Sequence, residues 1–382
     1  MESVIVVGGG CAGLRVARRL AENDIPVTVL EDHPQIGVPE HCSGLISARN
    51  TKELGFDLSD SRTNHIYGAK LYSPNNTQLR IESKEPVAHV MDRSKFDQTL
   101  YKEALDAGAT VELNTSVMSV RGNSVFTQNK GRGGVRKASI IVAADGVNSR
   151  LRKSAGIESK ATDFIHSYQA KVAGSFDPRM VELYFGTDIA PHFFAWVIPE
   201  NEESAKVGLG CRMGMNPATV FKHFIREKQL SVHVKSENSF LIPCARPIRK
   251  LYADPLVLLG DAAFQTKATT GGGIIMNTKA ADILGKVIQE NIAHDTPLTE
   301  YEKRMAPIFR ELELHHRIHQ YQASLTDTYL DKLFLKLKDA GMEEFLSREG
   351  DMDEPSRFIS KLLRTPRMIT LLPEALGFAL AK

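Results

Sequence analysis

A glycine-rich turn near the start of the chain constrains the fold more than any other feature. The turn, Gly8–Gly13, follows the apolar run Val4–Val7 and opens a helical pattern over residues 11–23. A second apolar run, Val27–Leu30, ends at the acidic residue Glu31. Strand, turn, helix and strand in this order predict a βαβ unit whose helix N-terminus faces a pyrophosphate and whose terminal acid binds a ribose. An exposed loop with a solvated Glu31 is the alternative.

A second glycine-rich turn lies far along the chain. The turn Gly271–Gly273 follows the apolar run Leu256–Leu259 and the tetrapeptide Gly260-Asp261-Ala262-Ala263. Asp261 therefore stands at the carboxyl end of a predicted parallel strand, where open α/β sheets bind ligands. Free amides at the start of the following helix, predicted from Gly272 to about Ile292, suit the negative charge of a reduced flavin. The two turns together predict a flavin dinucleotide held at both ends, although Asp261 alone is equally compatible with a simple helix cap.

The remaining segments predict a second sheet and a helical end. Residues 66–91 alternate around a turn at Pro74–Asn76, and residues 164–211 read as short strands between turn signals, both of which are typical of antiparallel strands. Beyond residue 298 the pattern is helical, and Thr299 and Glu302 have the spacing of a capping box. We predict a discontinuous nucleotide-binding domain (1–65, 92–153 and 253–298), an antiparallel-sheet substrate domain (66–91 and 154–252) and a helical C-terminal region (299–382).

Composition excludes several classes of function. The 382 residues carry a formal net charge of +2, from 48 basic and 46 acidic residues, which gives no electrostatic footprint for nucleic acid. The four cysteines, Cys11, Cys42, Cys211 and Cys244, lack CxxC spacing, so we expect neither a disulfide framework nor a metal site. Without a signal peptide or an apolar stretch near the ~20 residues of a membrane-spanning helix, the chain is expected to be cytoplasmic. Peripheral contact with the inner face of the cell membrane is left open.

Three further motifs resemble those of a known family. Pro191–Pro199, with the sequence PHFFAWVIP, is similar to the PxxYxWxFP signature of geranylgeranyl reductases, and Ala205–Gly210 follows it as in that family. Gly37–Ser47 is similar to the family's cysteine-bearing flavin loop. The resemblance covers nearly the whole chain. At the level of the fold, the chain resembles flavoproteins of the aromatic-hydroxylase type through both glycine turns, Glu31, Arg93 with Phe96-Asp97, and Ala144-Asp145-Gly146.

The resemblance implies FAD as the cofactor and an α/β + α+β fold. In this fold, of the aromatic-hydroxylase or glutathione-reductase-2 type, a FAD-binding Rossmann-like three-layer domain joins an antiparallel-sheet substrate domain and a helical C-terminal region. Arg93 would reach the pyrophosphate or ribityl, the alternative being a solvated arginine paired with Asp92 or Asp97, and the backbone of Val117 would contact the adenine. The implied FAD-binding residues are Gly8, Gly10, Ala12, Gly13, Glu31, Cys42, Ser43, Leu45, Arg93, Val117, Asp261, Gly272, Gly273 and Ile274.

The resemblance also implies where a substrate binds. Alternation along a strand places Phe194, Trp196 and Ile198 on one face, where they would contact a polyprenyl chain, although an ordinary sheet core has the same pattern. Phe194 and Ile198 stand where the signature usually has Tyr and Phe. Cys42 is the candidate catalytic proton donor, with an inert packed thiol as the alternative. Cys11 has a positional role, because only a small residue fits among the turn glycines.

The second glycine turn departs from the family pattern. Phe264 stands where a small residue is usual, and Ala268 stands where a proline is usual. These substitutions leave FAD binding intact but change the expected shape of the pocket over the ring. Lys267, beside Ala268, either places a positive charge near the reduced flavin or is a solvated surface lysine. The solvated alternative is favoured because lysines are usually exposed.

The implied function is FAD-dependent saturation of carbon-carbon double bonds in geranylgeranyl chains of isoprenoid membrane lipids or their precursors, as part of phospholipid biosynthesis. An isolated alkene has no group to support a carbanion, so we expect proton delivery to accompany hydride delivery from reduced FAD. No second dinucleotide turn is present, so ferredoxin, NAD(P)H or a deazaflavin remain possible electron donors. An FAD-dependent monooxygenase acting on a small aromatic, and a non-catalytic prenyl-binding carrier, are the alternatives.

The C-terminal tail is apolar and basic. It either closes a lipid tunnel, rests at a membrane surface or packs against the sheet domain. The residues concerned are Lys361, Leu362, Leu363, Arg364, Arg367, Met368, Ile369, Leu371 and Leu372.

Overall fold

The first sheet is the nucleotide-binding core predicted from the βαβ pattern. The computed structural model describes residues 2–158, 160–362 and 364–365. Strand β1 pairs in parallel with both β2 and β11, and its residues Val4–Val6 are fully buried because neighbouring strands and helices cover it. In spatial order the path is β17 (Tyr252–Ala253), β18 (Leu256–Leu258), β11 (Arg132–Ala143), β1 (Glu2–Val7), β2 (Val27–Leu30) and β8 (Thr110–Glu112), with β9 (Thr115–Arg121) and β10 (Ser124–Asn129) extending from β11.

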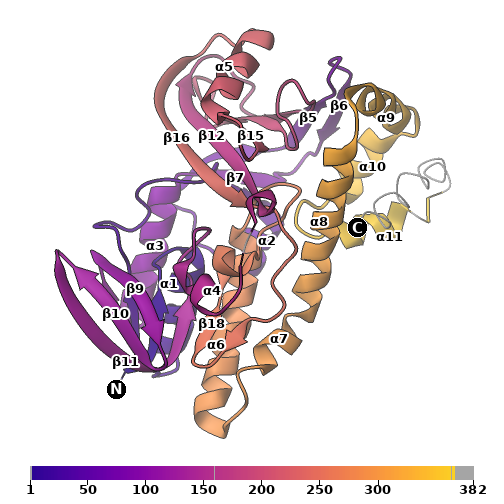
Figure 1. Ribbon diagram of the computed structural model, residues 1–382. Helices are drawn as coiled ribbons and strands as arrows, with labels where there is room; N and C mark the ends of the chain where they lie inside the picture. Colours follow the sequence, from indigo (N-terminus) through magenta and orange to yellow (C-terminus); the bar gives the residue numbers. More distant parts are fainter. Residues whose placement is uncertain (1, 159, 363, 366–382) are drawn as a thin grey trace.

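Two helices that are far apart in the sequence lie against each other. Helix α1 (Cys11–Ala21) packs against α6 (Ile274–His294), and Figure 1 shows both beside the first sheet. The Asp282 carboxylate on α6 accepts from Arg15 Nε at 2.7 Å and from Arg19 Nε at 2.8 Å on α1. Both glycine turns directly precede these helices, so the fold brings their N-termini to the same edge of the sheet.

The second sheet is antiparallel, as predicted for segments 66–91 and 164–211, except that β5 and β13 pair in parallel. It has seven strands, and Figure 1 shows it above the first sheet. Helix α5 (Pro217–Glu227) covers one of its faces with the buried rings of Phe221 and Phe224. The spatial order is β16 (His233–Pro243), β12 (Phe164–Ala173), β15 (Ser204–Arg212), β14 (Ala195–Pro199), β13 (Met180–Tyr184), β5 (Gly68–Tyr72) and β6 (Gln78–Glu82).

Shorter elements connect the two sheets. Helix α3 (Arg93–Asp106) contacts α1 and begins at Asp92, whose side chain caps it by accepting from the Lys95 N–H at 3.0 Å. The other connecting elements are the three-stranded sheet β3 (Leu45–Ser47), β7 (Ala88–Met91) and β4 (Arg62–Ile66), the helices α2 (Ala48–Glu53) and α4 (Arg150–Ser154), and the 3-10 turns η1 (Ala161–Asp163) and η2 (Gly260–Ala263).

The described C-terminal region is helical. Helix α8 runs from the end of the first sheet up to the second, as Figure 1 shows. Helices α9 and α10 pack against edge strand β6, and the Glu343 carboxylate accepts from the Arg80 N–H at 2.6 Å. The elements are α7 (Glu300–Arg304), α8 (Ala306–Ser324), α9 (Asp327–Asp339), α10 (Met342–Glu349) and α11 (Pro355–Leu362).

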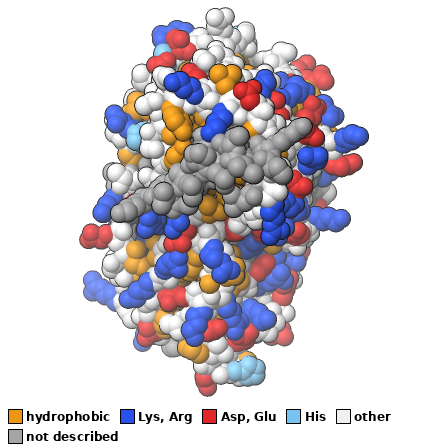
Figure 2. All heavy atoms as spheres, turned by 90° about the vertical axis from the view of Figure 1, so that its right-hand side faces the viewer, with side chains coloured by type: hydrophobic (Ala, Val, Ile, Leu, Met, Phe, Trp, Pro, Cys, Tyr) orange, Lys and Arg blue, Asp and Glu red, His pale blue; other side chains and the backbone are white. Residues whose placement is uncertain are grey.

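The predicted roles of the apolar tail involve residues beyond this region. Leu363, Arg367, Met368, Ile369, Leu371 and Leu372 lie outside the described residues. Among the helices of the described ranges, none is long and apolar enough to cross a bilayer. Figure 2 shows basic and acidic side chains interspersed over the face that carries these helices.

The predicted α/β + α+β fold class is confirmed, whereas the three domain boundaries remain predictions. One local expectation is wrong: the side chain of Thr299 makes no capping bond, and Glu302 does not close a capping box. Instead, the Glu302 carboxylate accepts from the backbone N–H groups of Leu251 at 2.7 Å and Tyr252 at 3.0 Å. A carboxylate that receives two donors from a neighbouring segment is better satisfied than one that receives a single cap bond.

Candidate active site

A cavity of about 480 Å³ lies where the two sheets and the N-termini of α1 and α6 meet. Its volume is in the range of small-molecule and cofactor sites. One side is formed by the glycine turns and the Cys42 loop, and the other by side chains of the second sheet. The residues predicted for the site that line this cavity are Gly10, Ala12, Cys42, Ser43, Leu45, Arg93, Phe194, Trp196, Ile198, Asp261, Gly272, Gly273 and Ile274.

Three glycines of the first turn have different structural roles. Gly8 has φ +104° and a Cβ there would lie 2.3 Å from the Ala144 carbonyl oxygen, while a Cβ on Gly13 would lie 2.0 Å from the Gly8 carbonyl oxygen. Gly8 and Gly13 therefore permit close packing of turn, helix and strand and do not line the cavity themselves. A Cβ on Gly10 would meet no atom within 4 Å, so Gly10 leaves open space beside the N-terminus of α1.

Glu31 lies at the end of β2, behind the first turn. Its buried carboxylate accepts from the Gly9 N–H at 2.6 Å and the His33 N–H at 3.0 Å. Burial alone would raise the pKa of Glu31, but these backbone donors outweigh it and lower that pKa. Glu31, Asp32 and His33 also bring three potential metal-ligand atoms within 4.8 Å of one another, although the backbone bonds already account for the Glu31 carboxylate. Val117 lies in β9 and, like Glu31, is not part of the cavity lining.

Arg93 and Asp97 form a largely buried ion pair beside the cavity, with 15% and 9% of their side chains exposed. Arg93 Nη2 donates to both carboxylate oxygens of Asp97, at 2.9 and 3.0 Å. Burial acts to lower the pKa of Arg93, but the Asp97 carboxylate raises it well above its ordinary value, so the guanidinium stays charged. The solvated alternative for Arg93 is therefore wrong: it pairs with Asp97, but it does so inside the protein. Its Nε is buried without a hydrogen-bond partner among the described residues.

Asp261 is held by side chains on either side of the second glycine turn. Its Oδ1 accepts from Thr266 Oγ1 at 2.8 Å and from Asn277 Nδ2 at 2.9 Å, which orients the carboxylate at the start of α6. Asn277 also lines the cavity, and its Oδ1 is buried with no partner in the described ranges. An unpaired donor on Arg93, an unpaired acceptor on Asn277 and two helix N-termini fit a long, polar, anionic ligand such as FAD.

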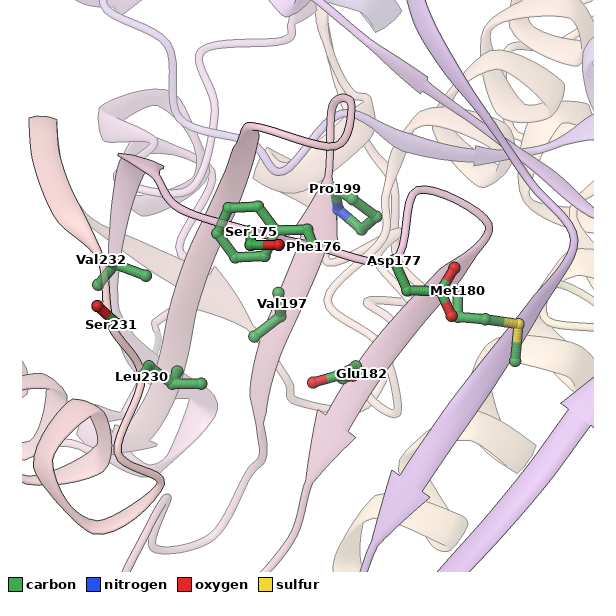
Figure 3. Close-up of a pocket in the computed structure, with 10 residues that line it drawn as sticks. All are labelled: Ser175, Phe176, Asp177, Met180, Glu182, Val197, Pro199, Leu230, Ser231 and Val232. Carbon is green, nitrogen blue, oxygen red and sulfur yellow. The ribbon is translucent and has the colours of Figure 1, made fainter.

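The opposite wall of the cavity is apolar. Phe194, Trp196 and Ile198 are buried and line the cavity; Trp196 and Ile198 belong to β14, and Phe194 directly precedes it. The alternate residues Val197 and Pro199 face a separate cavity of about 110 Å³ on the other side of the sheet, where Figure 3 shows them beside Phe176. The predicted strand alternation is therefore present, and it separates the apolar wall of the main cavity from a smaller cavity that Asp177 and Glu182 also line.

The Cys42 loop connects the two walls. The Cys42 thiol accepts from the Gly44 N–H at 3.4 Å, and its carbonyl accepts from Gln169 Nε2 of β12 at 3.3 Å. Burial lowers the pKa of the neighbouring His41, with the charges of His33 and Arg93 acting in the same direction. Burial raises the pKa of Cys11 to about 11, which suits a positional role rather than a reactive one.

Sequence reasoning missed several parts of the lining, including Val181 and Leu183 of β13 and residues 240–243 of β16. Ala69, Leu71 and Ile81 of the β5–β6 hairpin extend the apolar wall, and their alternation is a signal that points to them. Asp353, from the loop before α11, also lines the cavity. No local signal marks Asp353, because its role depends on a partner from another part of the chain.

Two expectations for the second turn are corrected. Lys267 is not a solvated surface lysine: it is buried, lines the cavity and pairs with Asp353. Phe264 does not change the pocket over the ring, because it is not part of the lining. Its ring packs against Phe164 and under the Arg152 guanidinium, 4.6 Å from the ring centroid.

Comparison with known proteins defines the class. Residues 1–202, more than half of the chain, match the family described as FAD binding domain. The protein is therefore a flavoprotein, and FAD is its cofactor. The chain is 31% identical over 358 residues to digeranylgeranylglycerophospholipid reductase 2 of Methanothermobacter thermautotrophicus, covering 88% of this chain and 91% of that protein. It belongs to the digeranylgeranylglycerophospholipid reductase family.

A second curated relative and a solved structure also match the chain. The chain is 30% identical over 364 residues to digeranylgeranylglycerophospholipid reductase of Methanosarcina acetivorans, covering 89% of each protein. A solved structure of a geranylgeranyl bacteriochlorophyll reductase-like protein from Thermoplasma acidophilum matches with a TM-score of 0.85, at 24% identity, over 97% of this chain and 98% of that chain. The structural match supports the fold.

Proposed function

We propose that the protein is an FAD-dependent reductase that saturates carbon-carbon double bonds in the geranylgeranyl chains of isoprenoid lipids. The observation that carries the proposal is a single cavity with one polar side and one apolar side. Helix N-termini and polar groups line one side, and Phe194, Trp196 and Ile198 line the other. The names of the curated relatives support geranylgeranyl lipid as the substrate class.

The polar side would hold the cofactor. Gly10 and the N-terminus of α1 leave room for the pyrophosphate, and Arg93 adds a largely buried positive charge whose Nε has no partner among the described residues. Asp261 would accept from a ribityl hydroxyl, and the amides at Gly272, Gly273 and Ile274 would face the flavin. Glu31 would bind the ribose and Val117 the adenine. Bound and reduced, FAD supplies a hydride.

The protein side chains would supply substrate alignment, exclusion of water and a proton. The apolar wall would align the prenyl chain and exclude water, since an alkene offers no polar group to bind. Saturation also needs a proton, and Cys42 is the candidate donor because this residue lines the cavity and carries a thiol. We expect Cys42→Ala to slow product formation while leaving reduction of the flavin unchanged. Product formation at the wild-type rate would exclude Cys42 as the donor.

The central experiment is a single turnover without oxygen. The protein is reduced with dithionite, geranylgeranyl lipid is added, and flavin reoxidation is followed together with product mass. We expect reoxidation coupled to a gain of two hydrogen atoms per reduced bond. A monooxygenase would instead consume oxygen when a small aromatic and NADPH are added, and a non-catalytic carrier would purify colourless.

The electron donor and the membrane contact are part of the proposal. Ferredoxin, NAD(P)H and reduced deazaflavin can each be tested anaerobically for the rate at which they bleach the flavin. Peripheral contact with a membrane would be tested by flotation with anionic liposomes of the full chain and of a chain lacking residues 366–382. This deletion keeps α11 and the loop that carries Asp353, so the cavity wall is retained. Equal flotation of the two chains would contradict a membrane role for the tail.

A further inference from the structure

Lys267 is held firmly beneath the second glycine turn. Its carbonyl accepts from the Gly271 N–H at 2.8 Å, and its own N–H donates to the Gly272 carbonyl at 3.2 Å. Its side chain passes along the turn, so that a Cβ on Gly272 would lie 3.1 Å from Lys267 Cε and 3.3 Å from Nζ. The ammonium group therefore lies at the N-terminus of α6, where that helix lines the cavity.

The partner of Lys267 comes from the C-terminal region. Lys267 Nζ donates to the Asp353 carboxylate and, at 3.3 Å, to the Met352 carbonyl. Asp353 is fully buried and also accepts from Asn50 Nδ2 at 2.6 Å. Burial would raise the pKa of Asp353, but the charge and hydrogen bond of Lys267, with further hydrogen bonds from Ser47 and Asn50, lower it. Asp353 is therefore ionised.

The loop around Asp353 has other attachments that do not reach the cavity. Arg49 pairs with Asp351 at 2.5 Å, and Lys279 of α6 pairs with Glu354 at 2.8 Å. Of the two lysines that hold this loop against the α6 region, Lys267 lines the cavity and Lys279 does not. His315 contacts the Asp353 carbonyl through Nε2, and burial lowers its pKa to about 4, so it adds no charge at neutral pH.

We propose that the Lys267–Asp353 pair sets the reduction potential of the bound flavin. A flavin that gains two electrons carries negative charge on its pyrimidine ring, and the protein tunes its potential through charges near that ring. Lys267 stabilises this negative charge together with the N-terminus of α6, and Asp353 offsets part of the effect. The inference rests on FAD binding in this cavity and not on the identity of the substrate.

The two halves of the pair should act in opposite directions. Lys267→Met leaves Asp353 uncompensated, so the affinity for reduced over oxidised FAD should fall about tenfold, which lowers a two-electron potential by about 30 mV. Asp353→Asn leaves Lys267 uncompensated and should raise the same ratio by a similar factor. The double variant is neutral and should return to within about threefold of the wild type.

The measurement is the midpoint potential of the holoenzyme, titrated with dithionite and a reference dye in the absence of lipid. Lys279→Met is the matched control, because it also frees the C-terminal loop but removes no charge from the cavity; it should leave the ratio within about threefold of the wild type. Shifts of the same sign in both single variants, or an equal shift in Lys279→Met, would overturn the proposal. If Lys267→Met purifies without FAD, the midpoint potential of Asp353→Asn is the deciding measurement. An unchanged or lowered potential in Asp353→Asn would then overturn the proposal.

Discussion

The indole Nε1 of Trp196 donates a 3.1 Å hydrogen bond to the side-chain oxygen of Gln169. The amide nitrogen of Gln169 in turn donates to the carbonyl of Cys42 at 3.3 Å. Gln169 is only 4% exposed, so water does not replace these bonds easily. One buried amide therefore joins the apolar wall of the cavity to the loop that carries the candidate proton donor.

Replacing this amide should destabilise the protein. Gln169→Leu leaves the Trp196 N–H and the Cys42 carbonyl without their partner, which should lower the free energy of unfolding by about 1–3 kcal/mol. Urea unfolding of the holoenzyme measures the change. Gln128→Leu is the control, since Gln128 is exposed on β10 and its loss should cost less than about 0.5 kcal/mol. Equal effects of the two substitutions would show that the buried bonds contribute nothing to stability.

Neighbouring residues of β14 should differ in their effect on catalysis. Ile198 faces the main cavity and Val197 faces the smaller one, yet both are 4% exposed. Ile198→Ala should lower kcat/KM for a geranylgeranyl lipid about tenfold, because apolar contact with the substrate is lost. Val197→Ala should leave kcat/KM within about twofold while still costing stability. A similar loss of kcat/KM in both variants would argue against a substrate-binding wall on the Ile198 side.

Two alanine substitutions in the first turn should separate folding from cofactor binding. A Cβ on Gly13 collides with the Gly8 carbonyl, so Gly13→Ala should lower the free energy of unfolding by about 2–4 kcal/mol. A Cβ on Gly10 meets no protein atom, so Gly10→Ala should fold normally and instead weaken FAD binding about tenfold or more. Unfolding of the apoprotein and titration with FAD distinguish the two effects. Unimpaired FAD binding by Gly10→Ala would exclude the space beside Gly10 as the pyrophosphate site.

Buried histidines of α8 should make stability depend on pH. Burial lowers the pKa of both His315 and His319 to about 4, from an ordinary value of 6.5. Between these values the unfolded chain binds protons that the folded chain does not, so stability is full above pH 6.5 and falls as the pH drops towards 4. Each histidine should contribute a slope of about 1.4 kcal/mol per pH unit in this window.

Urea unfolding at several pH values tests this expectation. His319→Gln should remove about one proton from the slope between pH 6 and 5. His319 suits the test because its Nδ1 is buried without a partner in the described part of the chain. Replacement of the exposed His294 is the control and should leave the slope unchanged. A wild-type slope in His319→Gln would contradict the assignment.

Much of the fold was predictable because its signals are local. The first βαβ unit follows from an apolar run, a glycine turn and a helical pattern that are contiguous in sequence, and β14 is a short apolar run near turn signals. The predicted capping box at Thr299 does not form, because a local sequence rule cannot account for partners that lie far along the chain. The backbone N–H groups of Leu251 and Tyr252, some 50 residues away, donate to the Glu302 carboxylate instead.

The site was predictable only in part. The glycine turns, Asp261 and the alternating aromatic wall have local patterns, and the structure brings Gly10, Asp261 and Trp196 to one cavity. For Lys267 the sequence predicts a solvated side chain, because a lysine in isolation is usually exposed. Its burial depends on a carboxylate that only the folded chain supplies.

By itself, the sequence determined that this protein has a dinucleotide-binding unit with a second contact point at Asp261 and an apolar strand between them, since backbone geometry and side-chain period fix such elements locally. Tertiary structure alone decided which charges lie inside the cavity. Lys267 and Asp353 are 86 residues apart, and each can be buried only because the other compensates its charge. Pairings of this kind have no sequence period, so only the folded chain reveals them.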